Sequence, residues 1–260
     1  MKPVEKIIKR VLFTFLTFRQ YLAVISSLYF VFHHLGILKN SPAFKYHYFL
    51  EKLINKDDIV IDIGANLGYF SVFFSNWVGE RGYVYAVEPV TPVRDVLKKN
   101  LRKRRNIGVL PYALGKENKN ISMGSTRDEN GVILTGSHFV LKANTGASEI
   151  HKAAMKKGSE IFNNLERLDF VKCDVEGYES VIIPEMKRII IRHKPVMLIE
   201  VKDENRFCLL DFLFRAGFQG YILKRGQLLP VSEEAEKLED DIIFIHKNKP
   251  VNFGLINSKT

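Results

Sequence analysis

Residues 58–68 of this chain read DIVIDIGANLG, and this stretch decides which fold we expect. The run from Asp58 to Ile63 is mostly apolar and rich in β-branched residues, which is typical of a strand buried inside a parallel sheet. Two glycines four residues apart, Gly64 and Gly68, then indicate a tight turn that leads into a helix. A buried strand that turns into a helix begins a βαβ unit, so the stretch predicts an α/β domain.

The sequence on either side continues this alternation. Further strands are predicted over residues 83–87, 107–110, 170–173, 195–201, 221–223 and 242–245, and helices over 45–54, 69–78, 92–100, 179–192 and 207–216. Residues 116–150 are polar and poorly periodic, with some strand character at 132–134 and 139–141. Strands that alternate with helices require right-handed crossovers. We therefore expect a doubly wound, mostly parallel, seven-stranded sheet.

Composition separates an N-terminal arm from this domain. Hydrophobic residues make up 46% of the 260 residues, which is enough for one substantial core. The chain divides near residue 40, so we expect a basic, apolar helical arm over residues 1–40 and a Rossmann-like domain over 41–260. The two cysteines, Cys173 and Cys208, form no disulfide or zinc pattern.

The arm suggests an anionic partner. It holds six Lys or Arg residues and one Glu, so it contributes half of the net charge of +10 of the whole chain. Residues 11–32 are long enough to span a bilayer, but Arg19 interrupts them, and a charge inside a membrane is costly. We favour a helix on an anionic membrane surface, with packing on protein and a true span as alternatives. The expected location is cytoplasmic, with peripheral contact at the membrane face.

The turn after the first strand predicts the ligand site. In sheets of this kind, ligands bind beyond the carboxyl ends of the strands. Gly68 begins a helix whose free N–H groups favour an anion, such as the carboxylate of S-adenosylmethionine. Asp62 is placed to accept hydrogen bonds from the ammonium of that molecule, directly or through water. Glu88 ends the next strand, where an acid accepts hydrogen bonds from both ribose hydroxyls of an adenosine.

A nicotinamide dinucleotide is the competing ligand for such a turn. Its site requires the pattern Gly-x-Gly-x-x-Gly, because the backbone must approach a pyrophosphate closely. Here Ala65 and Asn66 occupy the place where the second glycine is needed. The sequence therefore disfavours a dehydrogenase.

At this point the chain resembles the FkbM-type methyltransferases, a branch of the class I, Rossmann-like methyltransferases. The resemblance depends on the motifs D-x-G-A-N-x-G from Asp62 and K-x-D-V-E-G-Y-E from Lys172. The matching segments are residues 58–79, 82–101, 110–115, 169–183 and 195–201. The resemblance implies a class I sheet with an antiparallel last strand, S-adenosylmethionine as methyl donor, and O-methylation of a hydroxyl on a sugar or polyketide-like acceptor.

The resemblance also implies roles for individual residues. The cofactor turn corresponds to Asp62, Gly64, Asn66 and Gly68, the ribose-binding acid to Glu88, and the segment near adenine to Ala113 and Leu114. Asp174, Glu176 and Gly177 match the hallmark after the fourth strand. Residues 116–157 have no clear match, which leaves the identity of the acceptor open.

Asp174 and Glu176 are the candidate catalytic residues. A hydroxyl acceptor benefits from a general base, and two acids separated by one residue in an extended segment lie on one side of the chain. The alternatives are that they bind a divalent cation, for which the sequence gives no specific support, or that Asp174 contacts the cofactor amine or caps a helix. Lys172 is expected to face the other side. Glu200, at the end of the next strand, is a weaker candidate.

These observations predict an S-adenosylmethionine-dependent O-methyltransferase. Its expected acceptor is a small molecule, glycan or lipid-linked molecule with a hydroxyl. An RNA methyltransferase is an alternative that only the basic charge supports, and no recognition motif indicates nucleic acid. A second alternative is a non-catalytic protein that binds S-adenosylmethionine, which the intact cofactor turn argues against. The basic run over residues 98–105 is expected to be a solvated helix end.

Overall fold

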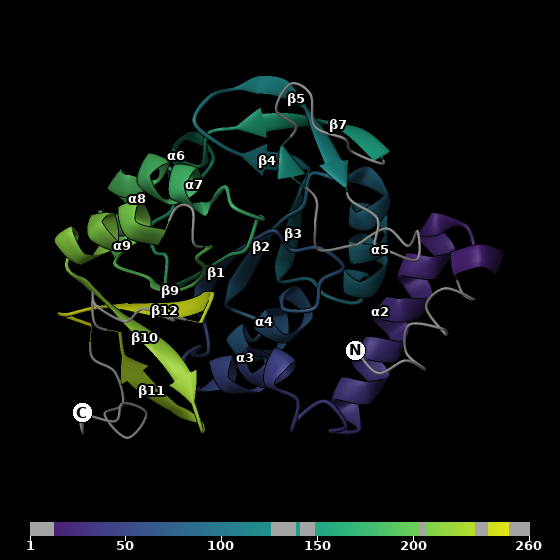
Figure 1. Cartoon of the computed structure of the whole chain (residues 1–260), viewed down its shortest axis with the longest axis horizontal. Helices are drawn as coiled ribbons and strands as arrows, with labels where there is room; N and C mark the ends of the chain where they lie inside the picture. Colours follow the sequence, from purple (N-terminus) through teal and green to yellow (C-terminus); the bar gives the residue numbers. More distant parts are fainter. Residues whose placement is uncertain (1–12, 126–138, 141–148, 203–205, 232–238, 250–260) are drawn as a thin grey trace.

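We describe a computed structural model of the chain, which places residues 13–125, 139–140, 149–202, 206–231 and 239–249 (Figure 1). Within these residues, eight strands form the main sheet in the order β11-β10-β12-β9-β8-β1-β2-β3. The strands are β1 Ile59–Ile63, β2 Tyr83–Val87, β3 Ile107–Leu110, β8 Phe170–Cys173, β9 Val196–Glu200, β10 Phe218–Lys224, β11 Gln227–Pro230 and β12 Asp241–His246.

The pairing confirms the predicted doubly wound sheet. Strands β3, β2, β1, β8 and β9 pair in parallel, and β12 runs antiparallel to both β9 and β10. Along the chain, β1 leads to β2 and β3 on one side, and β8 and β9 lie on its other side. The strand order therefore reverses at β1, which is where ligands bind in such sheets.

The sequence predicted seven strands in this sheet, and the described residues contain an eighth. Strand β11 pairs antiparallel with β10 through a two-residue turn at Arg225 and Gly226. Both turn residues have positive φ, 49° and 78°, as a tight hairpin turn requires. The prediction missed this strand because arginine rarely occupies such a position.

Helices cover both faces of the sheet. On one face, Ile61, Val171 and Met197 pack against α7 (Glu179–Glu185), α8 (Lys187–His193) and α9 (Arg206–Arg215). On the other face, Val60 and Phe170 pack against α3 (Lys45–Phe49) and α4 (Ser71–Val78). This alternation along each strand explains why the strands read as continuous apolar runs.

The helix predicted over residues 179–192 is two helices. It breaks at Met186, whose backbone φ and ψ are −81° and 11°. Pro184 lies two residues before the break and cannot donate a backbone hydrogen bond, which weakens the helix there.

A second sheet covers the carboxyl ends of the main strands (Figure 1). In the described part of the chain its order is β4-β7-β5-β6, formed by Tyr112–Leu114, Glu149–Lys156, Lys119–Ser125 and Phe139–Val140. Strand β6 agrees with the predicted strand character at 139–141, whereas 132–134 lies outside the described residues. The sequence missed β5 and β7 because only one face is apolar and lysines interrupt it. A short helix, α6 (Gly158–Ile161), follows β7.

The described part of the N-terminal arm packs on the domain. Helix α2 (Phe18–His34) begins with a capping box between Thr17 and Gln20 and lies beside α5 (Thr91–Leu101) (Figure 1). The residue that interrupts the apolar run, Arg19, forms an ion pair with Asp95 at 3.2 Å.

Buried contacts hold α2 against α5 as well. Leu22 is fully buried in a cluster with Val93 and Val96, and the Asn100 amide donates a hydrogen bond to the Ser26 hydroxyl at 3.2 Å. Among the helices that the structure describes, none has the length and apolar character needed to cross a bilayer.

Candidate functional site

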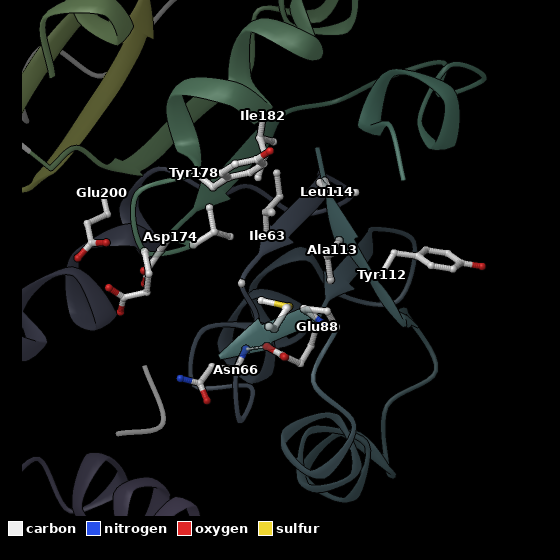
Figure 2. Close-up of a pocket in the computed structure, with 16 residues that line it drawn as sticks. Ile63, Asn66, Glu88, Tyr112, Ala113, Leu114, Asp174, Tyr178, Ile182 and Glu200 are labelled. Atoms are coloured by element: carbon white, nitrogen blue, oxygen red, sulfur yellow. Dashed lines mark hydrogen bonds between the residues drawn. The ribbon is translucent and has the colours of Figure 1, made fainter. Parts of the chain in front are cut away.

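An open cavity lies at the carboxyl ends of β1, β2, β8 and β9, beneath β4 and β5. Most of the predicted site residues line it. They are Gly64, Asn66, Glu88, Ala113, Leu114, Asp174 and Glu176, and the weaker candidate Glu200 lines it too. Figure 2 shows Asn66 and Glu88 at one end of the cavity and Asp174 and Glu200 at another.

The turn after β1 needs glycine for packing as well as for its backbone angles. Gly64 has φ +78°, and a Cβ atom there would lie 1.9 Å from the carbonyl oxygen of Asp174. The turns after β1 and β8 therefore touch through Gly64, and this contact places Asp174 at the rim of the cavity. Asn66 also has positive φ, 51°, which is tolerated better by asparagine than by most residues.

Asp62 and Gly68 lie behind the wall of the cavity. Asp62 is fully buried, and it accepts a hydrogen bond from the Ser71 hydroxyl at 2.6 Å. A Cβ atom on Gly68 would lie 2.8 Å from the Leu97 side chain of α5. Both residues thus support the turn from within, and neither lines the cavity as the sequence led us to expect.

Glu88 is held in place by the backbone. Its carboxylate accepts hydrogen bonds from the N–H groups of Asn66 at 3.0 Å and Val90 at 2.8 Å. The side chain is buried, and burial raises the pKa of Glu88 to about 7, although the two N–H donors act against this. Near neutral pH the carboxylate is partly ionised and still has lone pairs for hydroxyl donors in the cavity.

Lys172 lies on the same side as the acids, contrary to expectation. Its ammonium lies 3.1 Å from the Asp174 carboxylate and 3.8 Å from that of Asp62, and above the Phe70 ring. Burial alone would lower the pKa of Lys172, but Asp174 and Asp62 outweigh it and raise the pKa. Residues two apart in an extended segment point to the same side of the chain, so the expectation that Lys172 faces away from Asp174 was wrong.

Three carboxylates meet at the rim, from Asp174, Glu176 and Glu200. Their oxygen atoms lie within 4.8 Å of one another, a spacing that would suit a divalent cation. The Lys202 ammonium already provides a positive charge here, since it pairs with Glu176 and lies 3.5 Å from Glu200. Burial, together with the charges of Asp174 and Glu176, raises the pKa of Glu200 to about 8.

The remaining wall is apolar. Ala113 and Leu114 on β4 are buried, and Met123 on β5 completes this side of the cavity. The sequence analysis did not predict Met123 as a site residue, although Ile121, Met123 and Ser125 are buried at every second position, as in a strand. An apolar wall beside a buried acid fits the base and ribose of an adenosine.

Comparisons with known proteins agree with this geometry. The family model described as the methyltransferase FkbM domain matches residues 62–219, which is more than half of the chain. A protein-L-isoaspartate O-methyltransferase of Methanosarcina mazei is 42% identical over 53 residues, which are 20% of this chain and 22% of that protein. The chain thus matches only about a fifth of the length of this curated relative.

Two solved structures are similar to the chain at low sequence identity. A methyltransferase FkbM from Methylobacillus flagellatus is 16% identical with a TM-score of 0.49, over 74% of this chain and 44% of that one. Fibrillarin of Aeropyrum pernix is 15% identical with a TM-score of 0.45, over 74% of this chain and 68% of that one.

Proposed function

This chain belongs to the FkbM methyltransferase family, and from this premise we propose that it transfers a methyl group to a hydroxyl of a sugar, glycan or lipid-linked acceptor. Membership supports the predicted enzyme class and, with it, the predicted methyl donor, S-adenosylmethionine. The choice of a hydroxyl acceptor rests on one observation. The cavity joins an adenosine-like end at Glu88 to a carboxylate pair, Asp174 and Glu200, that suits proton removal.

We assign the adenosine to the inner end of the cavity. Glu88 accepts hydrogen bonds from the ribose hydroxyls, and Ala113, Leu114 and Met123 pack against the base. Gly64 and Asn66 form the floor with their backbone. Asp62 acts indirectly, because it is buried and holds Ser71 and Lys172.

The carboxylates at the rim remove the proton of the acceptor. When bound, S-adenosylmethionine would supply an electrophilic methyl group, and its sulfonium would become a neutral thioether after the transfer. As the acceptor oxygen forms its bond to the methyl carbon, Glu200 takes the hydroxyl proton. A pKa of about 8 makes Glu200 basic enough for this and still partly ionised at neutral pH. Asp174 is held by Lys172 and orients the hydroxyl, while Glu176 is held by Lys202.

Calorimetry tests the cofactor site. We expect S-adenosylmethionine and S-adenosylhomocysteine to bind the wild type, NADH to bind poorly, and Glu88→Ala to weaken both adenosyl ligands at least tenfold. Glu51→Ala is the matched control, because Glu51 is an exposed acid outside the cavity. Preferential binding of NADH would contradict the proposal.

Release of S-adenosylhomocysteine tests the acceptor class. We expect release with hydroxyl-bearing glycosides and none with RNA transcripts. Methylation of RNA would favour the alternative suggested by the basic charge. Tight cofactor binding without turnover on any acceptor would favour a non-catalytic binding protein.

We also propose that the enzyme works at the cytoplasmic face of a membrane, with residues 1–40 as its surface-binding arm. The described part of the arm exposes the apolar side chains Phe15, Leu28, Val31, Phe32, Leu35 and Ile37. The neighbouring helix α5 ends in exposed lysines and arginines, at Lys98, Lys99, Arg102, Lys103 and Arg105. Apolar and basic side chains on adjacent helices suit an anionic lipid surface.

A further inference from the structure

We propose that a second cavity, next to the first, binds the acceptor and takes one uncharged, hydroxyl-bearing ring. Tyr46, His47, Phe70 and Asp241 line it, and it shares Asp174 and Glu200 with the cofactor cavity. This inference rests on the proposed methyl transfer. Four of its ten lining residues, Ala43, Tyr46, His47 and Asp241, lie outside residues 62–219, so this chain builds part of the wall from segments that the family model does not describe.

The cavity has room for a single ring. Its volume is about 170 Å³. A protein cavity of roughly 150 Å³ holds a benzene molecule, so one six-membered ring fits and a second ring would have to extend outward.

One wall is an aromatic surface. The His47 imidazole stacks on the Phe70 ring, with centroids 3.8 Å apart and planes at 20°. The Tyr46 hydroxyl donates a hydrogen bond to the backbone carbonyl of Asp241 at 2.7 Å, which ties this segment to β12. The C–H face of a saturated ring packs well on such a surface.

His47 also offers a polar atom. Its Nδ1 atom is buried and has no hydrogen-bond partner among the residues that the structure describes. Burial, with a contribution from the nearby Lys172 ammonium, lowers the pKa of His47 to about 3. The ring is therefore neutral, and we infer that its Nδ1 atom accepts a hydrogen bond from a ligand hydroxyl, because a buried polar atom without a partner is costly.

The charges around the cavity disfavour an anionic ring. Carboxyl groups come from Asp174, Glu200 and Asp241, and the ammonium of Lys172 is already paired with Asp174. Burial, followed by the charge of Asp174, raises the pKa of Asp241 to about 6. Carboxylates accept hydrogen bonds from hydroxyls, whereas a phosphate or carboxylate on the ligand would be repelled.

The shared residues connect binding with reaction. Asp174 and Glu200 form part of both cavities, so a ring in the second cavity presents a hydroxyl to the same carboxylates that face the methyl donor. The hydroxyl nearest to these carboxylates is the one that becomes methylated.

The test is ligand-observed saturation-transfer NMR on the full chain saturated with S-adenosylhomocysteine. The probes are methyl α-D-glucopyranoside and methyl α-D-mannopyranoside, with glucose 6-phosphate and glucuronate as anionic counterparts. We expect at least one neutral glycoside to bind at millimolar concentration and the anionic sugars to bind at least tenfold more weakly.

Two variants locate the binding. Ala43 also lines the second cavity and is exposed, so Ala43→Phe fills the space without removing a buried group. His47→Phe keeps an aromatic ring and removes the nitrogen. Each should weaken glycoside binding at least tenfold and change the affinity for S-adenosylhomocysteine less than twofold. Tyr48→Phe, outside the cavity, is the control.

The outcomes separate this inference from the proposed function. If S-adenosylhomocysteine binds but no neutral glycoside does, or if anionic sugars bind better, the acceptor site is overturned and the methyltransferase remains. Glycoside binding that survives both Ala43→Phe and His47→Phe also overturns it. If S-adenosylhomocysteine itself fails to bind, the proposed function falls first.

Discussion

At the scale of single residues, Lys172 provides the positive charge that compensates two nearby carboxylates. It is almost fully buried and lies within 4 Å of both Asp62 and Asp174. Leaving a buried charge without its partner costs about 3–5 kcal/mol. We therefore predict that Lys172→Met lowers the free energy of unfolding by about this amount at pH 8, measured by urea denaturation.

The deficit of this variant should depend on pH with a defined sign. Burial already raises the pKa of Asp62, and loss of the Lys172 ammonium raises it further. When folding raises the pKa of a carboxyl group, the folded protein loses stability as the pH rises above the pKa of that group in the unfolded chain. The deficit should thus be smaller at pH 5 than at pH 8, and Lys172→Met with Asp62→Asn should recover part of it. An equal deficit at both pH values would argue that lost packing is the cause.

The raised pKa of Glu88 predicts pH-dependent cofactor binding. In the proposed complex the ionised carboxylate accepts hydrogen bonds from the ribose hydroxyls. The pKa of Glu88 is about 7 in the free protein. Protonation below that pH competes with the ligand, so the Kd of S-adenosylhomocysteine should be about tenfold weaker at pH 6 than above pH 8. Calorimetry from pH 6 to 8.5 measures this. Glu88→Gln should bind weakly with a flat profile, and a flat profile in the wild type would reject the role of Glu88.

Glu200 should govern the pH profile of the reaction. A general base acts in its ionised form, so the single-turnover rate should rise with pH, reach half its maximum at about pH 8, the pKa of Glu200, and level off at higher pH. Glu200→Gln should reduce the rate at least a hundredfold. Its affinity for S-adenosylhomocysteine should remain within about threefold of the wild type. If Asp174→Asn abolishes the pH dependence and Glu200→Gln preserves it, the roles of the two acids are reversed.

At the scale of elements, α2 belongs to the folded domain through its buried face. Leu22 is completely buried against α5, whereas Leu28 on the same helix is 40% exposed. Truncation of a buried leucine costs about 2–5 kcal/mol, and truncation of an exposed one rarely exceeds about 0.5 kcal/mol. We predict that Leu22→Ala destabilises the whole domain by the larger amount and Leu28→Ala by the smaller, measured by urea denaturation. Equal small effects would mean that α2 unfolds independently of the domain.

Sequence patterns predicted the strands whose residues are mostly apolar. Strands β1, β8 and β9 are buried along almost their whole length, β2 and β3 are partly buried, and all five were predicted within about one residue. The strands β5, β7 and β11 were missed because the alternation of buried and exposed residues in each is short, as at Ile121 and Met123 in β5. The periodicity of apolar residues indicates which residues are buried. It therefore predicts the main sheet and misses most of the second sheet, which covers the cavity.

At the scale of the whole molecule, some residues of the candidate site could be predicted from the sequence and others could not. Gly64, Glu88 and Asp174 were found because each follows a strand, and parallel strands bring their ends together. His47 and Met123 were not found, since they reach the two cavities from elements whose place depends on the complete tertiary structure. Motifs thus locate the cofactor end, whereas the acceptor end requires the fold.

The surface of the whole molecule predicts selective binding to anionic membranes. The chain has a net charge of +10, exposed apolar side chains follow α2 at Leu35 and Ile37, and α2 packs beside α5, after which the exposed residues Arg102 and Lys103 are basic. Each basic residue near an anionic bilayer contributes about 1 kcal/mol, and salt screens this attraction.

In vesicle sedimentation we expect binding to phosphatidylglycerol-containing vesicles, little binding to phosphatidylcholine alone, and loss of binding in 0.5 M salt. Leu35→Asp with Ile37→Asp should reduce binding at least fivefold, whereas Ile191→Asp, at an exposed apolar site on α8, should not. If both kinds of vesicle pellet the protein equally, or neither does, residues 1–40 do not recognise an anionic surface.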